Sequence, residues 1–224
     1  MFLDSYQLSS LVAQVQYGSA YLLWDRAGLI ANEMTKIWSD LELVEGQPQR
    51  QILRSDLVQI ETGLKTSTIT LKRPASIDHF VEQLKQTFEI WGKALELEEA
   101  SRVSSRAVYA KNCTSLGEAN KEIIALGIVP WPSGKVFDQP ENGERNSFDL
   151  TYRFEDDESF SILRIHTEQV AIELKLNREF ELDEKIERKK TTHRILVDFD
   201  RGVLGAVAYP NFRVADWFKG FQHC

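Results

Sequence analysis

The positions of apolar residues along the chain predict a series of short strands and longer helices. Residues 11–17 alternate between apolar and polar side chains, and this period of two is typical of a strand with one buried face. Over residues 22–41 the apolar side chains return every three or four positions, which predicts an amphipathic helix. The change of period indicates that a helix follows the first strand directly.

The same reasoning extends through the next hundred residues and gives a defined order of elements. Residues 53–61 and 65–73 are expected to pair as a hairpin that turns at a glycine. Ser76 is a suitable N-cap for a second apolar-striped helix, and a strand over residues 101–111 follows it. The order β-α-β-β-α-β predicts a ferredoxin-like first half, residues 1–112, with helices on one face of an antiparallel sheet.

The second half, residues 113–224, is predicted to be rich in strands. A capping box over residues 115–118 begins a short helix, and alternation over residues 148–176 predicts a β-meander of three strands. A second hairpin, over residues 193–209 with its turn at residues 200–202, leads to a C-terminal helix. We therefore expect an α+β protein whose two halves each contain a sheet and pack as one compact unit.

One long segment, residues 128–147, has no regular pattern and holds three of the six prolines. A loop of this length inside a compact domain is usually functional, and a plain linker is the alternative. Trp131 stands between two of these prolines, so its indole has little conformational freedom to lose on binding. We interpret Trp131 as a partner-binding candidate, with a plug at the junction between the halves as the alternative.

Charged residues on two predicted strands give further candidates. Arg102 and Arg106 lie on one strand and form a local basic exception to the acidic balance of the chain. Asp198 and Asp200 share one face of another strand, where two carboxylates can hold a divalent metal ion. The alternative is that Asp198 is exposed and Asp200 begins a turn.

Motifs with a known catalytic mechanism are absent from the sequence. It contains no nucleophile elbow, no phosphate-binding loop, no dinucleotide fingerprint and no zinc-protease motif. A second metal hypothesis combines His166, His193 and Glu173, and it requires all three on one face of the sheet. An enzymatic function would therefore rest on the metal candidates alone.

Composition narrows the classes of function. The chain has 224 residues, a formal net charge of -7, 42% hydrophobic and 27% charged residues, which is typical of a soluble globular protein. The acidic excess argues against a nucleic-acid partner, because affinity for phosphates comes largely from Lys and Arg. The two distant cysteines give no zinc-site spacing, and no apolar run is long enough for a membrane span. With no signal peptide in view, we expect a cytoplasmic protein without a cofactor.

The order of elements resembles an uncharacterised, sporadically distributed bacterial family of α+β proteins of about 250 residues. The matching features are the strand at residues 11–17, the hairpin within residues 53–73, and the apolar helix that leads into residues 102–112. Cys113 and the spacing around it depart from the family's pattern. The resemblance implies no catalytic residue, and it implies an accessory protein of the kind found in bacterial defence or toxin–antitoxin systems.

These observations predict a non-catalytic protein-binding or accessory protein. It would bind a protein partner, or a second copy as a homodimer, through Trp131, Arg102 and Arg106. The first alternative is a metal-dependent hydrolase or nuclease that uses Asp198 and Asp200. The second alternative is a small-ligand-binding protein, which predicts an apolar cavity between the helices and the second sheet.

Overall fold

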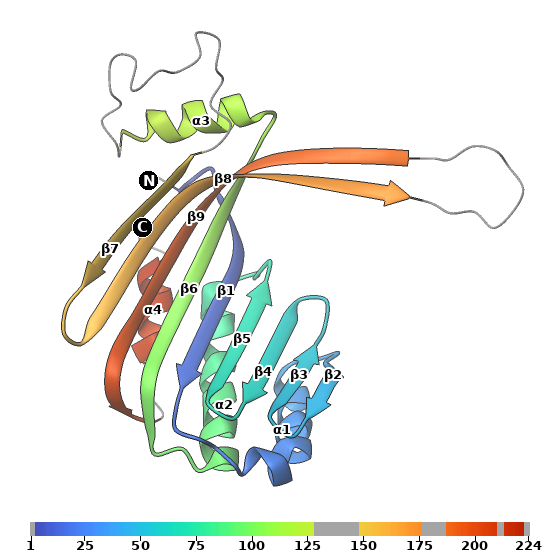
Figure 1. The fold of residues 1–224 in the computed structure, drawn as a ribbon, viewed down its shortest axis with the longest axis vertical. Coiled ribbons are helices and arrows are strands. Elements are labelled where there is room, and N and C mark those ends of the chain that lie inside the picture. The colour runs from blue at the N-terminus through green and yellow to red at the C-terminus, as the bar shows by residue number, and fades with distance from the viewer. Residues whose placement is uncertain (1–2, 128–147, 176–186, 210–212, 222–224) are drawn as a thin grey trace, which may run out of the picture.

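The computed structural model of the chain describes residues 3–127, 148–175, 187–209 and 213–221. Within these ranges the chain forms nine strands and four helices, and the predicted α+β class is confirmed (Figure 1). The strands are β1 (Gln7–Gln16), β2 (Glu42–Gln47), β3 (Arg50–Arg54), β4 (Val58–Gly63), β5 (Thr66–Lys72), β6 (Glu99–Cys113), β7 (Asp149–Glu155), β8 (Ser159–Lys175) and β9 (Glu187–Ala208).

All nine strands belong to one antiparallel sheet. Their order is β2-β3-β4-β5-β1-β6-β9-β8-β7. The junction between the halves is the long pairing of β6 with β9, which runs from Glu99 opposite Ala208 to Cys113 opposite His193. The expectation of a separate sheet in each half is therefore wrong, because β6 pairs with β1 on one side and β9 on the other.

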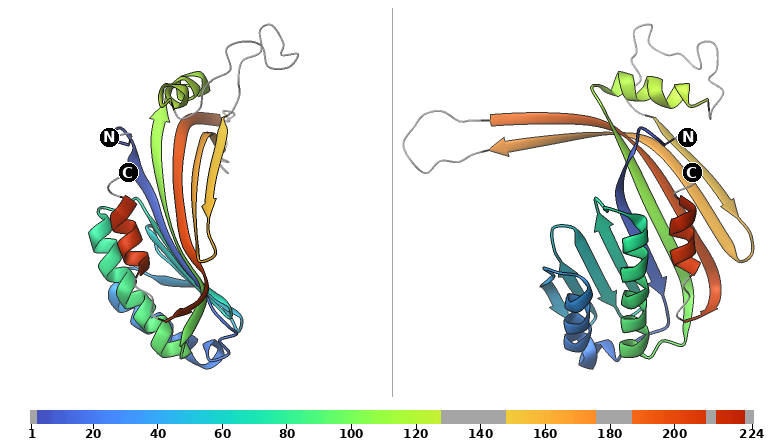
Figure 2. Two further views of the ribbon diagram at one scale, coloured as in Figure 1. Left: turned by 90° about the vertical axis from the view of Figure 1, so that its left-hand side faces the viewer. Right: turned by 180° about the vertical axis from the view of Figure 1, so that it is seen from behind.

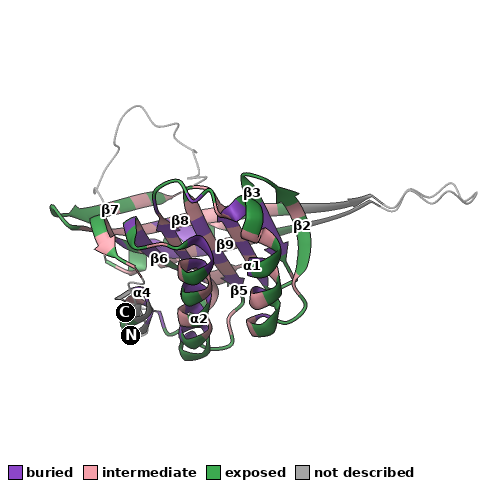
Figure 3. Cartoon of the chain, turned by 90° about the horizontal axis from the view of Figure 1, so that it is seen from below, coloured by how far each residue is buried: buried purple, intermediate pink, exposed green. Residues whose placement is uncertain are grey.

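Three helices pack against one face of this sheet, and a fourth lies at its end (Figure 2). The helices on the face are α1 (Leu23–Ile37), α2 (Ile77–Leu95) and α4 (Arg213–Phe221), and α3 (Leu116–Ala125) lies at the end. The apolar stripe of α2 is buried, as the sequence predicts, whereas on α1 Ile30 and Met34 are buried and Leu29 of the predicted stripe is exposed. Figure 3 shows the outer sides of α1 and α2 exposed. None of the described helices is long and apolar enough to cross a membrane.

Local sequence determines where two of these helices begin. The Ser76 hydroxyl accepts a hydrogen bond from the His79 backbone N–H at 3.2 Å, so the predicted N-cap of α2 is confirmed. Ser115 caps α3 in the same way, through the Glu118 N–H at 3.1 Å. The Glu118 carboxylate returns to the backbone N–H of Thr114, which completes a variant of the expected capping box.

The face of the sheet opposite α1, α2 and α4 is called here the open face. On β1 the side chains of Leu11, Ala13 and Val15 are fully buried beneath the helices, so the residues between them point to the open face. Gln14 is one of these, and the register places Thr68 of β5 beside it. Polar side chains therefore line this face, as expected where a sheet is covered on one side only.

The first half contains more strands than the sequence predicts. The segment expected to form one strand over residues 53–61 is divided into β3 and β4, and a turn closes between them where Ser55 N–H donates to Val58 C=O at 2.8 Å. β2 precedes them and was not expected, since Leu43 and Val44 are both exposed and give no alternation. The hairpin of β4 and β5 is confirmed.

The second half differs from expectation in two strands that are longer than predicted, β8 and β9. Residues 200–202 do not form a hairpin turn, because β9 runs through them without interruption. Gly202 instead provides space for the ring of Phe160, since a Cβ at Gly202 would lie 2.4 Å from Phe160 Cε1. The three-strand meander expected over residues 148–176 is wrong, because β8 is one continuous strand from Ser159 to Lys175 where two strands were expected. β8 pairs with β7 and β9, and β8 and β9 continue beyond the sheet as a two-stranded arm (Figure 1).

Candidate functional site

A buried carboxylate on β9 is the centre of a charged cluster on the open face. Asp198 has a side chain that is only 1% exposed, and it accepts hydrogen bonds from two arginines. Arg106 of β6 donates from Nε to Oδ1 at 2.8 Å, and its Nη2 lies 2.6 Å from Oδ2. Arg164 of β8 donates from Nη1 to Oδ2 at 3.2 Å. The carboxylate therefore binds one guanidinium from each neighbouring strand.

Strand register explains why these three side chains meet. Arg164 lies directly opposite Asp198 in the β8–β9 pair, so both side chains project from the same face. Arg106 lies opposite Asp200, one step along the same face, and reaches Asp198 diagonally. The arginines remain 44% and 35% exposed, so several of their N–H donors still face solvent.

Arg102 approaches the same cluster by a different contact. Its guanidinium carbon lies 4.6 Å from the centroid of the Phe160 ring, which is a cation–π arrangement. Phe160 is only 4% exposed and lies over the backbone of Gly202. The Nε of Arg102 is buried without a hydrogen-bond partner among the described residues. Arg102 therefore rests on an aromatic surface and keeps an unused donor.

Asp200 is the second carboxylate of the cluster. Burial raises its pKa above the usual range, and the negative charge of Asp198 adds to this rise. The positive charges of Arg102 and Arg106 act in the opposite direction without cancelling it. Among the described residues, Asp200 makes no side-chain hydrogen bond or ion pair, so its carboxylate is held near the arginines by the strand alone.

The structure unites candidates that the sequence left separate. Arg102, Arg106, Asp198 and Asp200 all lie on the open face of adjoining strands. We call these four residues, together with Arg164, the arginine cluster. Arg164 was missed, and so was Phe160, which lies beneath Arg102. Their roles depend on the β8–β9 register, and the sequence carries no local signal of it. Trp131 lies outside the described residues.

The contacts of Asp198 argue against the hypothesis that Asp198 and Asp200 bind a metal ion. Both parts of the alternative to that hypothesis are wrong, because Asp198 is buried and Asp200 lies inside a strand. A metal ion at Asp198 would have to displace two guanidinium groups from the carboxylate. In the part of the chain that the structure describes, no three His, Cys, Asp or Glu side chains are placed to hold a metal ion.

The second metal hypothesis fails on the geometry of β8 and β9. His193 lies opposite Gln169, whereas His166 is three positions from Gln169 on the same strand. Because successive side chains alternate between faces, His166 and His193 project from opposite faces of the sheet. The two imidazoles therefore cannot bind one ion.

Two grooves in the described part of the chain lie beside the helices, and neither of these two lies between the helices and the strands of the second half. One groove of about 1060 Å³ lies where α1 ends and α2 begins, and Trp38, Arg73 and His79 contribute to its lining. The other, of about 380 Å³, runs between α1 and α2 past Leu29 and Ile90. Neither groove corresponds to the apolar cavity that a small-ligand function predicts.

No family model matches the chain, and no curated protein matches it. The arginine cluster and its surroundings therefore carry the information about function.

Proposed function

We propose that the protein is a non-catalytic binding protein whose open face docks an acidic segment of a protein partner. The observation that supports this most directly is the fixation of Arg106 and Arg164 by Asp198, a carboxylate that is 1% exposed. Asp198 binds one side of each guanidinium group, and other N–H donors of the two arginines remain exposed to solvent. Arg102, held on Phe160, adds a third cation on the same face.

Pre-organisation is the physical reason that this arrangement favours binding. A free arginine side chain loses rotamer freedom when it binds a partner, at a cost of about 0.5–1.5 kcal/mol. Asp198 already imposes that order on Arg106 and Arg164 in the unbound protein. A buried ion pair contributes little to net stability, because desolvation offsets the attraction, so the fixed orientation is its main consequence.

The charge balance of the cluster selects an acidic partner. Three arginines face two aspartates, and Asp200 is disfavoured in its ionised form by burial and by Asp198. Arginine matches the geometry of carboxylates through paired N–H donors. A nucleic acid would extend beyond the cluster and meet the acidic remainder of a chain with a net charge of -7, so a short acidic peptide segment fits better.

The test measures binding of a fluorescent oligo-glutamate peptide by anisotropy at low and moderate salt. We expect salt-sensitive binding to the wild-type chain and a loss of at least about tenfold in affinity for Arg102→Gln/Arg164→Gln. Arg54→Gln is the matched control, since Arg54 is an exposed arginine of β3, far from the cluster in the strand order. Equal binding by the double variant contradicts the assigned surface.

The same assay separates the remaining functions. Tighter binding of a single-stranded oligonucleotide than of the peptide contradicts the protein-binding function. Calorimetric titration with Mg²⁺ and Mn²⁺ tests the metal-dependent hydrolase or nuclease, and heat that disappears in Asp198→Asn would favour it. Trp131→Ala, in the same peptide assay, tests whether that residue takes part in the interaction.

Two further parts of the hypothesis, the cellular role and the ferredoxin-like core, are proposals with separate support. The role as an accessory protein of a bacterial defence or toxin–antitoxin system rests on the family resemblance alone. For the fold, we infer that β4, β5, β1 and β6 with α1 and α2 form a ferredoxin-like core in which β2 and β3 are inserted. The strand order and antiparallel pairing support this inference.

A further inference from the structure

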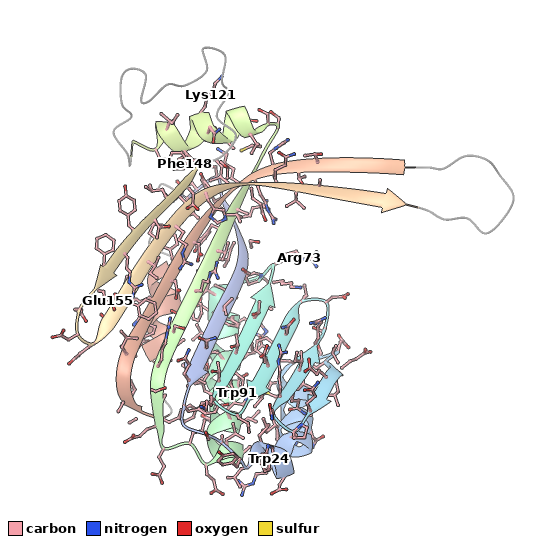
Figure 4. The ribbon with its side chains drawn as sticks, in the orientation of Figure 1. Trp24, Arg73, Trp91, Lys121, Phe148 and Glu155 are labelled. Carbon is pink, nitrogen blue, oxygen red and sulfur yellow. The ribbon has the colours of Figure 1, made fainter. Side chains whose placement is uncertain are left out.

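The outer edge of the sheet at β7 is regular and is not blocked by any described element. β7 pairs with β8 over seven consecutive residue pairs without a register shift, and it is the last strand in the order. Figure 4 shows Phe148 beside one end of this edge strand and Glu155 at the other. The opposite edge, β2, carries a bulge between Leu43 and Glu45, which is a common protection of an edge against pairing.

The hydrogen bonds at both ends of β7 show which backbone groups point outward. Phe148 C=O accepts from Thr167 N–H at 2.9 Å, and Asp156 N–H donates to Ser159 C=O at 3.0 Å. Because hydrogen-bonded pairs alternate along an antiparallel ladder, the even-numbered residues of β7 bond to β8. The outward donors and acceptors therefore belong to Asp149, Thr151, Arg153 and Glu155.

We propose that a second copy of the chain pairs with this edge, β7 against β7, with Thr151 opposite the partner's Thr151. This antiparallel register joins outward backbone groups to outward backbone groups, as a ladder requires. It also places Asp149 opposite the partner's Arg153 on one face, and this happens twice because the pairing is two-fold symmetric. Asp149 makes no side-chain hydrogen bond or ion pair among the described residues.

In the same register, the side chains on the opposite face of the paired strands are apolar. Leu150 lies opposite the partner's Tyr152, and Phe148 lies opposite the partner's Phe154. Phe154 is 65% exposed in the single chain, which makes it the most exposed of the large hydrophobic residues in the described part of the chain. Aromatic cross-strand pairs stabilise sheets, so the pairing covers a side chain that water otherwise surrounds.

Charge excludes the two registers shifted toward Glu155, and a register centred on Leu150 would pair Asp149 with the partner's Thr151 and lose both opposite-charge pairs. A register centred on Tyr152 places Asp149 opposite the partner's Glu155, and one centred on Arg153 places two arginines opposite each other. Like charges directly opposite destabilise a strand pair. Arg153 also donates to Glu155 of its own strand from Nε at 2.7 Å, and its Nη2 lies 2.6 Å from the same oxygen, so the N–H groups of Nη1 are left for the partner's Asp149.

The dimer goes beyond the proposed docking function and does not depend on it. Thr151 lies opposite Arg164 in the β7–β8 pair, so the two-fold axis passes beside both arginine clusters. Three strand spacings separate Arg164 from its symmetry mate, a distance of about 14 Å along the joined sheet. The open faces of the two copies would thus form one surface with two arginine clusters.

Sedimentation equilibrium measures the assembly. We expect a mass of twice 25.7 kDa for the wild-type chain. Arg153→Asp and Asp149→Arg should each weaken the dimer by at least about tenfold, because each opposes like charges twice. The double variant Asp149→Arg/Arg153→Asp restores opposite charges and should recover the wild-type affinity. A monomeric wild-type chain, or single variants that associate as well as wild type, overturns the proposal.

Cross-linking tests the register in a Cys113→Ser/Cys224→Ser background. Opposed residues of an antiparallel pair have Cα atoms about 4.5–5.5 Å apart, which is within disulfide range. Thr151→Cys should therefore form a dimer under mild oxidation, and Arg153→Cys, four residues from its symmetry mate, should not. Cross-linking of Arg153→Cys without that of Thr151→Cys overturns the assigned register. Circular dichroism spectra confirm that each variant is folded.

Discussion

Arg106 lies against Asp198 with two donors on one carboxylate, across the junction where the two halves of the chain become one sheet. Nε donates to Oδ1 at 2.8 Å and Nη2 lies 2.6 Å from Oδ2. The pair joins β6 to β9 by side chains in addition to the backbone ladder. Because Asp198 is the buried member and Arg106 the exposed one, the two residues are not equivalent in their contribution to stability.

The first prediction follows from that asymmetry. Arg106→Gln leaves a buried carboxylate with Arg164 as its one strong partner, and we expect a loss of about 2–4 kcal/mol in the free energy of unfolding. Asp198→Asn leaves two arginines that can reach water, so its loss should be smaller, about 1–2 kcal/mol. Urea unfolding followed by circular dichroism measures both. A larger loss for Asp198→Asn than for Arg106→Gln contradicts this account of burial.

The second prediction concerns the pH dependence of stability through Asp200. Its pKa is raised in the folded state above 3.8, so the folded state binds the proton more tightly than the unfolded state. Stability therefore improves as the pH falls through the raised pKa toward 3.8, and the ionised carboxylate lowers stability above that window. Asp200→Asn should be more stable than wild type at neutral pH, with a difference that disappears near pH 3.8 in thermal unfolding.

Asp156 is the matched control, because its shift has the opposite sign. The backbone N–H groups of Glu158 and Ser159 donate to its carboxylate and lower its pKa below 3.8. Its stabilising contribution is present at neutral pH and is lost as the pH falls through the lowered pKa. Asp156→Ala should therefore lower the stability at neutral pH. An equal pH profile for the Asp200 and Asp156 variants would refute the assignment to Asp200.

Features that depend on neighbouring residues were predictable from the sequence. Ser76 and Ser115 cap their helices as expected, since a cap requires only the next three residues. The alternation over residues 11–17 likewise predicts β1 and its buried face correctly. These elements are determined within one turn of helix or a few residues of strand.

Features that depend on strand pairing were not predictable. Arg164 and Asp198 are 34 residues apart, and their contact follows from a register that no local pattern encodes. The sequence Asp200-Arg201-Gly202 has the composition of a turn, so the continuous strand was missed there. A glycine signals either a turn or a close approach, and at Gly202 the close approach of Phe160 is the actual cause.

The third prediction tests that close approach. In Gly202→Ala the new methyl group would lie 2.4 Å from Phe160 Cε1 and 2.8 Å from the Val103 carbonyl oxygen. We expect a loss of about 1–3 kcal/mol in unfolding free energy, because the ring and the strand must both move. The loss in the double variant Gly202→Ala/Phe160→Ala should be smaller than the sum of the two single-variant losses, since the ring clash is gone. Strict additivity in urea unfolding contradicts the contact.

The fourth prediction compares two helical glycines that differ only in what lies beside them. At Gly28 of α1 an added Cβ would meet nothing within 4 Å, so Gly28→Ala should stabilise the protein by about 0.5–1 kcal/mol through helix propensity. At Gly92 of α2 the same Cβ would lie 2.5 Å from Tyr209 Cε1. That ring is held by a hydrogen bond from its hydroxyl to Phe88 C=O at 2.6 Å and by stacking on Phe88, with centroids 6.1 Å apart.

Gly92→Ala should therefore lose about 1–3 kcal/mol, because overpacking against a fixed ring exceeds the gain in propensity. Replacing Tyr209 with Ala in the Gly92→Ala chain removes the clash, so the added methyl group should then cost nothing relative to Tyr209→Ala alone. Urea unfolding of the four chains gives the comparison directly. If Gly92→Ala and Gly28→Ala stabilise the protein equally, the packing of Tyr209 onto α2 is not as described, and the attachment of the end of β9 to the helical layer would have to be reassigned.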